Sequence, residues 1–200
     1  MCNQREFEMS SKLECDPRID PRIKASLAGF ELAAGPNVSS REELLAQEYS
    51  KEALAGLARV TEFFDSMDSE EVAPSKGLAV RTEIFTSSPD GNRIKIQYIR
   101  ADTDKILPCV TYIHGGGMAT SSCYQGNFKA WGRMIAAHGV AVAMVDFRNA
   151  VHSSSTPDTA PFPAGLNDCI SGVKWVYAKA ASLGIDPRRI IVAGKAAAAT

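Results

Sequence analysis

Several features that would assign a chain to a special class are missing from this sequence. No apolar run approaches the roughly 20 residues that a membrane-spanning helix needs, and the first residues, MCNQREFEMSSK, contain no basic region followed by an apolar stretch. The 22 basic and 23 acidic side chains nearly cancel. We therefore expect no nucleic acid and no membrane surface as a partner, and a cytoplasmic location.

The cysteines form no recognisable framework either. There are 5 of them, an odd number, and no two form a C-x-x-C pair. This pattern argues against a disulfide scaffold and against a zinc site, so reduced thiols are the simplest interpretation. With 45% hydrophobic and 22% charged residues in a chain of 200, the composition is that of an ordinary globular protein with one sizeable core.

The first third of the chain carries helical signals. The segment that starts at Asp16 opens after prolines, and Ser40 to Glu43 have the form of a capping box ahead of a helical run. Apolar residues recur at helical spacing in that run, at Leu54, Leu57 and Phe64. We expect a helical segment over residues 1–74 that packs on the rest of the chain.

The hydrophobic pattern changes its period in residues 75–200. Apolar and polar residues alternate over 78–84 and 94–99, and the turn residues Pro89 to Asn92 between them predict an antiparallel hairpin. Three continuous apolar runs follow, ILPCVTYI, VAVAMV and IIVAG, with helix-length segments between them. Such runs are typical of parallel strands buried on both faces, so the predicted fold class is α/β, a mostly parallel sheet with flanking helices.

The two segments between these runs are expected to be helices whose apolar stripes lie against the sheet. The first stripe contains Phe128, Trp131, Ile135 and His138; the second contains Leu166, Cys169, Ile170, Val173, Val176, Tyr177 and Ala180. We accordingly interpret His138 as a packed core residue. His152 lies in a serine-rich loop and is interpreted as a surface residue.

The strongest chemical signal is the run His114-Gly115-Gly116-Gly117, directly after the first continuous strand. Consecutive glycines let the backbone approach a ligand closely and point successive N–H groups into one cavity, as the stabilisation of an oxyanion requires. A glycine-rich turn without a ligand is the alternative. A phosphate loop is disfavoured, because neither G-x-x-x-x-G-K-[ST] nor G-x-G-x-x-G is present.

This run opens a series of motifs that resembles the hormone-sensitive-lipase family, also called bacterial family IV esterases, among the α/β-hydrolases. The later motifs are Val145 to Arg148, Phe162 to Cys169, Gly184 to Ile190 and Ile191 to Gly194. The first three are similar to the family's V-D-Y-R, F-P-A-A-x-x-D-C and G-x-D-P-x-R-I. The resemblance implies the N-terminal part of an α/β-hydrolase fold over residues 75–200, preceded by helical cap segments over residues 1–74.

The resemblance also implies a chemistry, the hydrolysis of small-molecule carboxylic esters through a serine acyl-enzyme, without a metal or organic cofactor. It makes Gly116 and Gly117 the expected oxyanion donors, with the N–H of Ala197 as a third, and His114 and Gly115 parts of the same motif. The polar residues expected to have structural roles near the site are Asp146, Arg148 and Asp168.

The nucleophile of the family is missing. After the fifth strand the family has G-x-S-x-G, whereas this chain ends Gly194-Lys195-Ala196-Ala197-Ala198-Ala199-Thr200 and carries Ala196 at the serine position. The family's catalytic Asp and His lie farther on, so we expect a truncated, inactive form without any triad residue. The alternatives are a small-molecule-binding protein with a hydrolase-like pocket, similar to plant gibberellin receptors, and a fragment without function.

A single lost base accounts for these last residues. A family-like ending encoded GGC GAA AGC GGC GGC GGC AAC CTG A becomes GGC AAA GCG GCG GCG GCA ACC TGA when one G is deleted. The shifted frame translates as Gly-Lys-Ala-Ala-Ala-Ala-Thr followed by a stop, which is the observed ending. We therefore hypothesise a frameshifted allele, a pseudogene or a sequencing error.

Overall fold

The computed structural model describes residues 17–27 and 38–195, and the chain divides into two compact units between Glu43 and Leu44. In the first unit, helix α2 (Pro21–Leu27) has a proline at its first position. The carboxylate of Asp20, just before the helix, accepts a hydrogen bond from the Arg22 N–H at 2.8 Å. A helix after the prolines is thus confirmed; its expected continuation lies outside the described residues.

Two helices, α3 (Arg41–Glu48) and α4 (Lys51–Asp65), follow the capping box. The Ser40 hydroxyl accepts from the Glu43 N–H at 3.1 Å, as the motif predicts. The Ser50 hydroxyl accepts from the N–H three residues later and begins α4. No residue of α4 is fully buried, so its apolar face is only partly covered.

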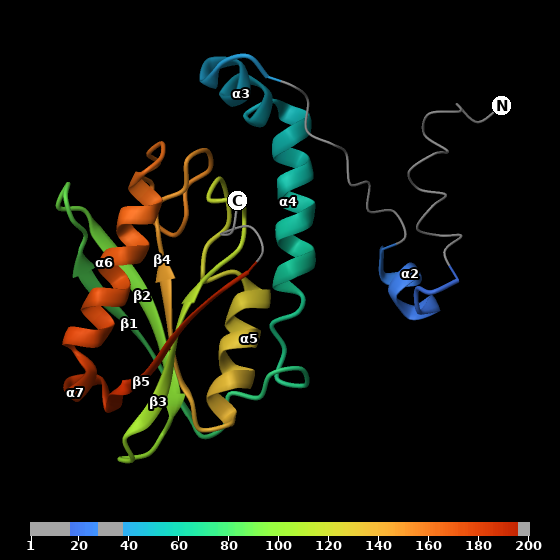
Figure 1. Ribbon diagram of the computed structural model, residues 1–200. Coiled ribbons are helices and arrows are strands. Elements are labelled where there is room, and N and C mark those ends of the chain that lie inside the picture. The colour runs from blue at the N-terminus through green and yellow to red at the C-terminus, as the bar shows by residue number, and fades with distance from the viewer. Residues whose placement is uncertain (1–16, 28–37, 196–200) are drawn as a thin grey trace. The chain divides into compact units, whose positions relative to one another are not determined.

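A mixed sheet of 5 strands, in the order β1-β2-β4-β3-β5, lies at the centre of the second unit (Figure 1). The strands are β1 (Leu78–Thr86), β2 (Arg93–Ala101), β3 (Leu107–Ile113), β4 (Ala141–Asp146) and β5 (Ile185–Gly194). β1 and β2 form the predicted antiparallel hairpin, β2 is antiparallel to β4, and β4, β3 and β5 are mutually parallel. Since only β2 runs against the others, the α/β fold class is confirmed.

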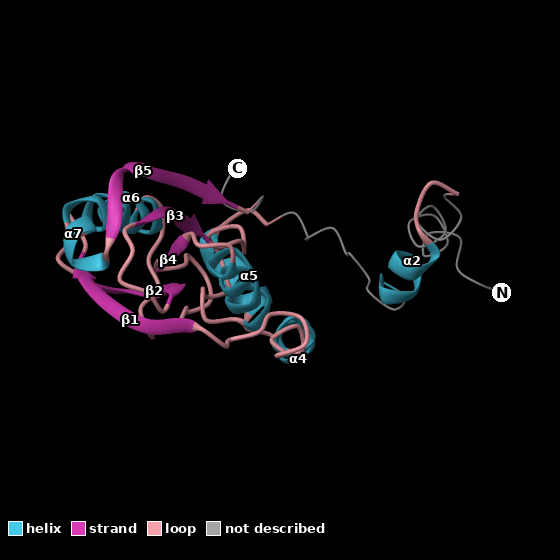
Figure 2. Ribbon diagram, turned by 90° about the horizontal axis from the view of Figure 1, so that it is seen from below, coloured by secondary structure: helices cyan, strands magenta, loops and turns pink. Residues whose placement is uncertain are grey.

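Helices cover both faces of this sheet (Figure 2). α5 (Gly126–Ala137) lies on one face, and α6 (Ala164–Ala178) lies with α7 (Ala180–Leu183) on the other. A separate apolar cluster lies between each face of the sheet and the helices that cover it. The α6 cluster includes Phe85, Ile94, Ile96, Val145, Phe147 and Val176; the α5 cluster includes Ile99, Val110, Tyr112, Phe128, Val142 and Met144. The central strand β4 is buried along its whole length, as its continuous apolar sequence predicts.

The side of α6 that faces the sheet differs from the predicted stripe. Cys169 and Val176 are buried as expected. The residues that point outward instead are Leu166, Ile170 and Tyr177, which are 41%, 44% and 62% exposed. A Cβ on Gly172 would lie 2.8 Å from Val145 Cγ2. Because glycine lets α6 approach the sheet this closely, small residues form the contact, and the prediction for those three large residues was wrong.

The two histidines outside the glycine motif have the opposite of their predicted environments. His138 is the C-cap of α5 and is exposed, because the helix ends at Ala137. The His152 side chain is only 12% exposed, since Glu48 and Tyr49 from a distant part of the chain lie against it. Both sequence interpretations were therefore wrong, the first about a helix end and the second about a long-range contact.

Three of the cysteines, Cys109, Cys123 and Cys169, are buried free thiols. Burial raises the pKa of the Cys109 and Cys169 thiols to about 12, so they are protonated core side chains rather than nucleophiles. Cys2 and Cys15 lie outside the described residues. In the described part of the chain, no helix is long and apolar enough to cross a membrane.

Helix α5 receives its N-terminal cap from a residue far away in the sequence. The residue at its own N-cap position makes no side-chain bond, but the Asp65 carboxylate at the end of α4 accepts from the Gly126 N–H at 2.7 Å. Asp68 adds ion pairs to Lys129 and Arg133 of α5. Negative charge at this end also suits the helix dipole.

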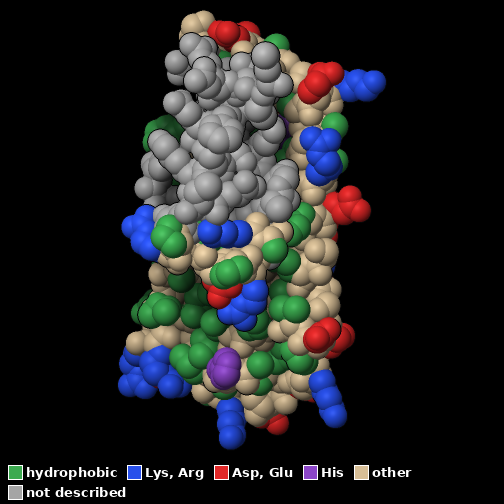
Figure 3. Space-filling model, turned by 90° about the vertical axis from the view of Figure 1, so that its right-hand side faces the viewer, with side chains coloured by type: hydrophobic (Ala, Val, Ile, Leu, Met, Phe, Trp, Pro, Cys, Tyr) green, Lys and Arg blue, Asp and Glu red, His purple; other side chains and the backbone are tan. Residues whose placement is uncertain are grey.

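On the side seen in Figure 3, hydrophobic side chains are exposed between basic and acidic ones.

The substitution Asp65→Ala should lower the free energy of unfolding by about 1 kcal/mol, because the loss of an N-cap side chain costs roughly 0.5–2 kcal/mol. Urea unfolding followed by circular dichroism measures the change. Glu62→Ala, at an exposed position of the same helix, is the matched control. Equal effects of the two substitutions would contradict the long-range cap.

The strand β5 is an edge of the described sheet, and its apolar side chains are open to solvent. Ile191 and Val192 are 61% and 58% exposed. Because successive side chains of a strand point to opposite faces, both faces of this edge are uncovered. An apolar edge of this kind presents unpaired N–H and C=O groups to any other chain.

We expect the 200-residue chain, expressed alone, to self-associate through β5. Val192→Lys should shift its elution in gel filtration toward the monomer, because charge on an edge strand opposes pairing. Met134→Lys, at a position of α5 that is 40% exposed, should leave the elution unchanged. A monodisperse monomer of the unsubstituted chain would show that this edge needs no partner.

Candidate functional site

The carboxyl ends of β3, β4 and β5 meet at one edge of the sheet, because these strands are parallel. β3 leads into His114, β4 ends at Asp146, and β5 leads into Lys195. The Lys195 N–H donates to the Ile113 carbonyl at 3.2 Å, so the turn after β3 lies beside the end of β5. Ligands of open α/β sheets bind at this edge.

The His114 ring is buried next to the glycine turn. It stacks on Phe147 with a centroid distance of 4.1 Å and 7° between the ring planes, and its Nδ1 lies 2.8 Å from the Gly115 carbonyl oxygen. Burial lowers the pKa of His114, so the ring is neutral at neutral pH. Nδ1 must then carry the proton, because a carbonyl only accepts. The remaining ring nitrogen, Nε2, has no hydrogen-bond partner among the described residues.

These contacts set the direction of two peptide N–H groups. In a trans peptide the C=O and N–H bonds point in opposite directions, so the bond from His114 to the Gly115 carbonyl turns the Gly116 N–H away from the ring. The Gly116 carbonyl accepts from the two N–H groups of Ala119 and Thr120, at 3.0 and 3.1 Å. The N–H of the following residue, Gly117, is thereby turned away from that loop. Within residues 38–195, neither glycine N–H donates a hydrogen bond.

The backbone of this turn requires glycine. φ is +119° at Gly116 and +63° at Gly117. A Cβ at Gly116 would lie 2.1 Å from the Thr120 carbonyl oxygen, whereas a Cβ at Gly117 would meet nothing within 4 Å. Met118 and Ser121, in the loop that follows, also have positive φ, 53° and 77°. Such strain collects at functional sites when the surrounding structure holds it in place.

Asp146 fastens the loops on either side of the turn. Its buried carboxylate accepts from the Ser122 hydroxyl at 2.6 Å and from the Cys123 N–H at 3.1 Å. It also accepts from the N–H of Ser155 at 3.1 Å and from its hydroxyl. Lys95 Nζ reaches the same serine at 3.2 Å. This bonding joins two loops at the end of β4, which is a structural role.

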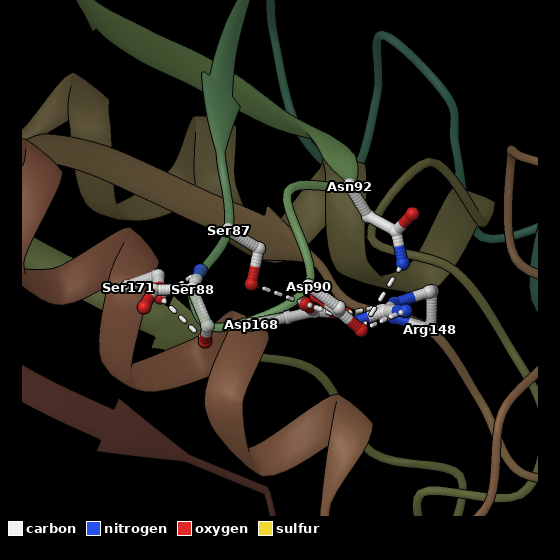
Figure 4. A network of polar contacts seen from close by, with 7 residues as sticks. All are labelled: Ser87, Ser88, Asp90, Asn92, Arg148, Asp168 and Ser171. Carbon is white, nitrogen blue, oxygen red and sulfur yellow. Dashed lines mark hydrogen bonds and ion pairs between the residues drawn. The ribbon is translucent and has the colours of Figure 1, made fainter.

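Arg148 and Asp168 form a buried ion pair (Figure 4). Nε and Nη2 of Arg148 each donate to Asp168 at 2.8 Å, and Nη1 donates to Asp90 at 2.7 Å. The Ser87 hydroxyl donates to Asp168 as well. Asp168 in the first place, and then Asp90, raise the pKa of Arg148. With 0% and 4% of their surfaces exposed, Asp168 and Arg148 serve each other rather than a ligand.

A cavity of about 200 Å³ opens beside the glycine turn. Its lining residues are Gly117, Met118, Arg148, Ala150, Ala160, Phe162, Gly165 and Leu166. The wall is mostly apolar, and its single charged residue, Arg148, is already paired with Asp168 and Asp90. The cavity therefore suits an uncharged ligand next to Gly117.

Lys195, the residue before the serine position Ala196, lies beside the glycine turn, a contact that the sequence analysis did not predict. Its side chain passes over Gly115, and its Nζ lies 5.4 Å from the ring centroid of Phe128 and 5.7 Å from that of Phe64. The ammonium group is thus held by two aromatic faces, one from α5 and one from α4. Ala196 and Ala197 lie outside the described residues, so their roles stay predictions.

Comparison with known proteins assigns this architecture to a family. The BD-FAE family model matches residues 96–200, more than half of the chain, including the glycine turn. The chain belongs to the BD-FAE family. Two of its relatives are an esterase and a lipase. Carboxylesterase NlhH of Mycobacterium tuberculosis (strain ATCC 25618 / H37Rv) is 37% identical over 91 residues, which are 46% of this chain and 26% of that protein. Hormone-sensitive lipase of Bos taurus is 30% identical over 136 residues, 66% of this chain and 16% of its own.

Solved structures agree with this assignment. Esterase Est22 is 57% identical with a TM-score of 0.89, over 93% of this chain and 54% of its own. Brefeldin A esterase, a bacterial homologue of human hormone-sensitive lipase, is 31% identical with a TM-score of 0.69, over 92% and 50%. The chain thus spans about half the length of these solved relatives. The α/β-hydrolase fold and the resemblance to hormone-sensitive lipase are confirmed.

Alanine substitutions should distinguish the two glycines of the turn. Gly117→Ala should cost about 1–2 kcal/mol of unfolding free energy, the usual cost of a left-handed conformation for a residue with a Cβ. Gly116→Ala should cost clearly more, because its Cβ would also collide with the Thr120 carbonyl. Guanidinium unfolding of both variants measures the difference. Equal costs would mean that the turn at Gly116 is wrongly described.

Proposed function

We propose that this chain provides the oxyanion-stabilising part of a carboxylic ester hydrolase of the hormone-sensitive-lipase type. The observation that carries the proposal is the pair of N–H groups at Gly116 and Gly117, whose directions are set by anchored carbonyls and which donate to nothing within residues 38–195. Donors preorganised in this way stabilise the charge that develops on a carbonyl oxygen during acyl transfer. By the family pattern, the N–H of Ala197 is the third donor.

The proposed substrate is an uncharged small-molecule ester with a small or medium acyl group. In the serine mechanism, the serine oxygen attacks the ester carbonyl carbon and a histidine accepts the serine proton. The carbonyl oxygen becomes an oxyanion held by the glycine N–H groups, the alcohol leaves, and water then hydrolyses the acyl-enzyme. The apolar cavity beside Gly117, where the Arg148 cation is already ion-paired, supports an uncharged group at that position.

Position 196 carries alanine in this chain, and a methyl group cannot attack a carbonyl. The 200-residue chain is therefore proposed to lack turnover. A serine placed at position 196 would still need a base, and His114 is a poor candidate. Its ring is buried against Phe147, its Nδ1 is bound to the Gly115 carbonyl, and burial lowers its pKa.

Residues 1–74 are proposed to form a cap for the α/β region of residues 75–200. Three described residues of this segment contact the α/β region and support the proposal. Phe64 lies against the Lys195 ammonium, Asp65 caps α5, and Glu48 pairs with His152. All three contacts lie near the carboxyl edge of the sheet or on α5.

A chimera tests the proposed function. Residues 78–194 of this chain replace the matched segment of esterase Est22, which is related closely enough for the exchange at 57% identity. The chimera should hydrolyse a short-chain p-nitrophenyl ester. Gly116→Ala in the chimera should lower kcat by about 10²- to 10³-fold, the usual loss for one oxyanion donor. The unfused 200-residue chain should stay at the buffer rate.

The matched control for the chimera is Gly139→Ala, a glycine whose φ is also positive, +77°, in the turn between α5 and β4. It should leave kcat unchanged, because this turn precedes β4 and therefore lies at the amino edge of the parallel strands, away from the proposed donors. A chimera that folds with a cooperative transition but does not hydrolyse the ester would overturn the proposed function. So would an equal loss of kcat in the two glycine variants.

A further inference from the structure

The α3–α4 corner, residues Glu48 to Ser50, contacts a loop that is far away in the sequence. The Glu48 carboxylate lies 3.3 Å from His152 Nε2, and the Tyr49 and His152 rings are 4.9 Å apart. The Tyr49 hydroxyl donates to the Val151 carbonyl at 2.8 Å. Three contacts of different kinds therefore attach the α3–α4 corner to residues 149–152.

Residues 149–152 in turn hold the strained loop that follows the glycine turn. The hydrogen bonds are Ala150 N–H to the Met118 carbonyl at 2.8 Å, Val151 N–H and His152 N–H to the Ala119 carbonyl at 3.2 and 2.8 Å, and Asn149 Nδ2 to the Ser121 carbonyl at 2.7 Å. Met118 and Ser121 are the non-glycine residues with positive φ in the described chain. Their conformation persists only while such bonds hold it.

The series of bonds ends at a proposed oxyanion donor. Ala119 and Thr120, in the strained loop, donate to the Gly116 carbonyl, and that carbonyl belongs to the same peptide as the Gly117 N–H. A continuous path of contacts thus runs from Tyr49 through Val151 and Ala119 to the Gly117 peptide. Each step is a hydrogen bond or a covalent link, and all of the residues involved lie within 49–152.

We propose that Tyr49 and His152 are positioning residues through which the α3–α4 corner holds the Gly117 N–H in its direction. The role of that N–H as an oxyanion donor rests on the proposed function. The coupling itself is a property of the chain as it exists. Loosening the helical corner should release residues 116–121 locally, because opening of such a loop is governed by the bonds that close it.

Hydrogen exchange of the 200-residue chain, read by mass spectrometry of its peptides, tests the coupling. Tyr49→Phe keeps the ring and removes the hydroxyl, and His152→Ala removes the pairing with Glu48. Each should accelerate exchange of the amides in 116–121 by about fivefold, the effect of one ordinary hydrogen bond on local opening. His152→Gln retains an N–H donor toward Glu48 and should restore much of the protection.

Two matched controls remove the same groups elsewhere. Tyr177→Phe changes a tyrosine of α6 that is 62% exposed, and His138→Ala changes the exposed histidine that ends α5. Neither should alter exchange in 116–121. The melting temperature of every variant is recorded, so that a local effect is separated from a general loss of stability.

Acceleration confined to 116–121 and 149–152, with rescue by His152→Gln, supports the proposal. Acceleration confined to residues 44–65, or spread evenly over the whole chain, overturns it. The exchange experiment needs no ester and no nucleophile. Its failure would leave the proposed function standing, whereas failure of the esterase chimera would leave the measured coupling standing.

Discussion

The buried ion pair of Arg148 and Asp168 is the interaction on which the rest of the site depends. It joins the loop after β4 to α6, and through Ser87 and Asp90 it joins both to the β1–β2 hairpin. Loss of one partner from such a pair costs about 3–5 kcal/mol, because the other charge is left buried and uncompensated. This is a large part of a typical domain stability of about 5–15 kcal/mol. The wall of the cavity beside Gly117 is therefore fixed by charges that are paired with one another.

On this frame the glycine turn is held by its carbonyls, not by its N–H groups. His114 binds one carbonyl from the inner side, and the Ala119 and Thr120 N–H groups bind the next. Planarity of the peptide then leaves two N–H groups pointing the other way. A site for an anionic transition state can be built in this manner without a free charged side chain, and Arg148 is already ion-paired with Asp168 and Asp90. It also makes the direction of the proposed donors, the Gly116 and Gly117 N–H groups, sensitive to the contacts that hold residues 118–121.

Much of the fold could be predicted because its signals are local. The period of two in β1 and β2, the turn residues between them and the continuous apolar runs of β3 and β4 all appear within a few neighbouring residues. The prediction of which face of α6 is buried failed for a physical reason. Apolar spacing says that a helix has a face to bury, but Gly172 decides how closely the helix approaches Val145 and therefore which face is buried. The prediction that His138 is a core residue failed for a similar reason, because periodicity does not locate the last residue of a helix.

The site divides in the same way. The amino-acid sequence by itself determined the run of glycines, the family resemblance that the comparisons confirm, and the alanine at position 196. Only the tertiary structure decided that Asp65 caps α5, that Lys195 lies between Phe64 and Phe128, and that Tyr49 reaches Val151. These partners are far apart in the chain and carry no shared spacing. They meet because the parallel strands bring their carboxyl ends to one edge of the sheet and α4 packs against α5, so their choice is a result of packing and not of local pattern.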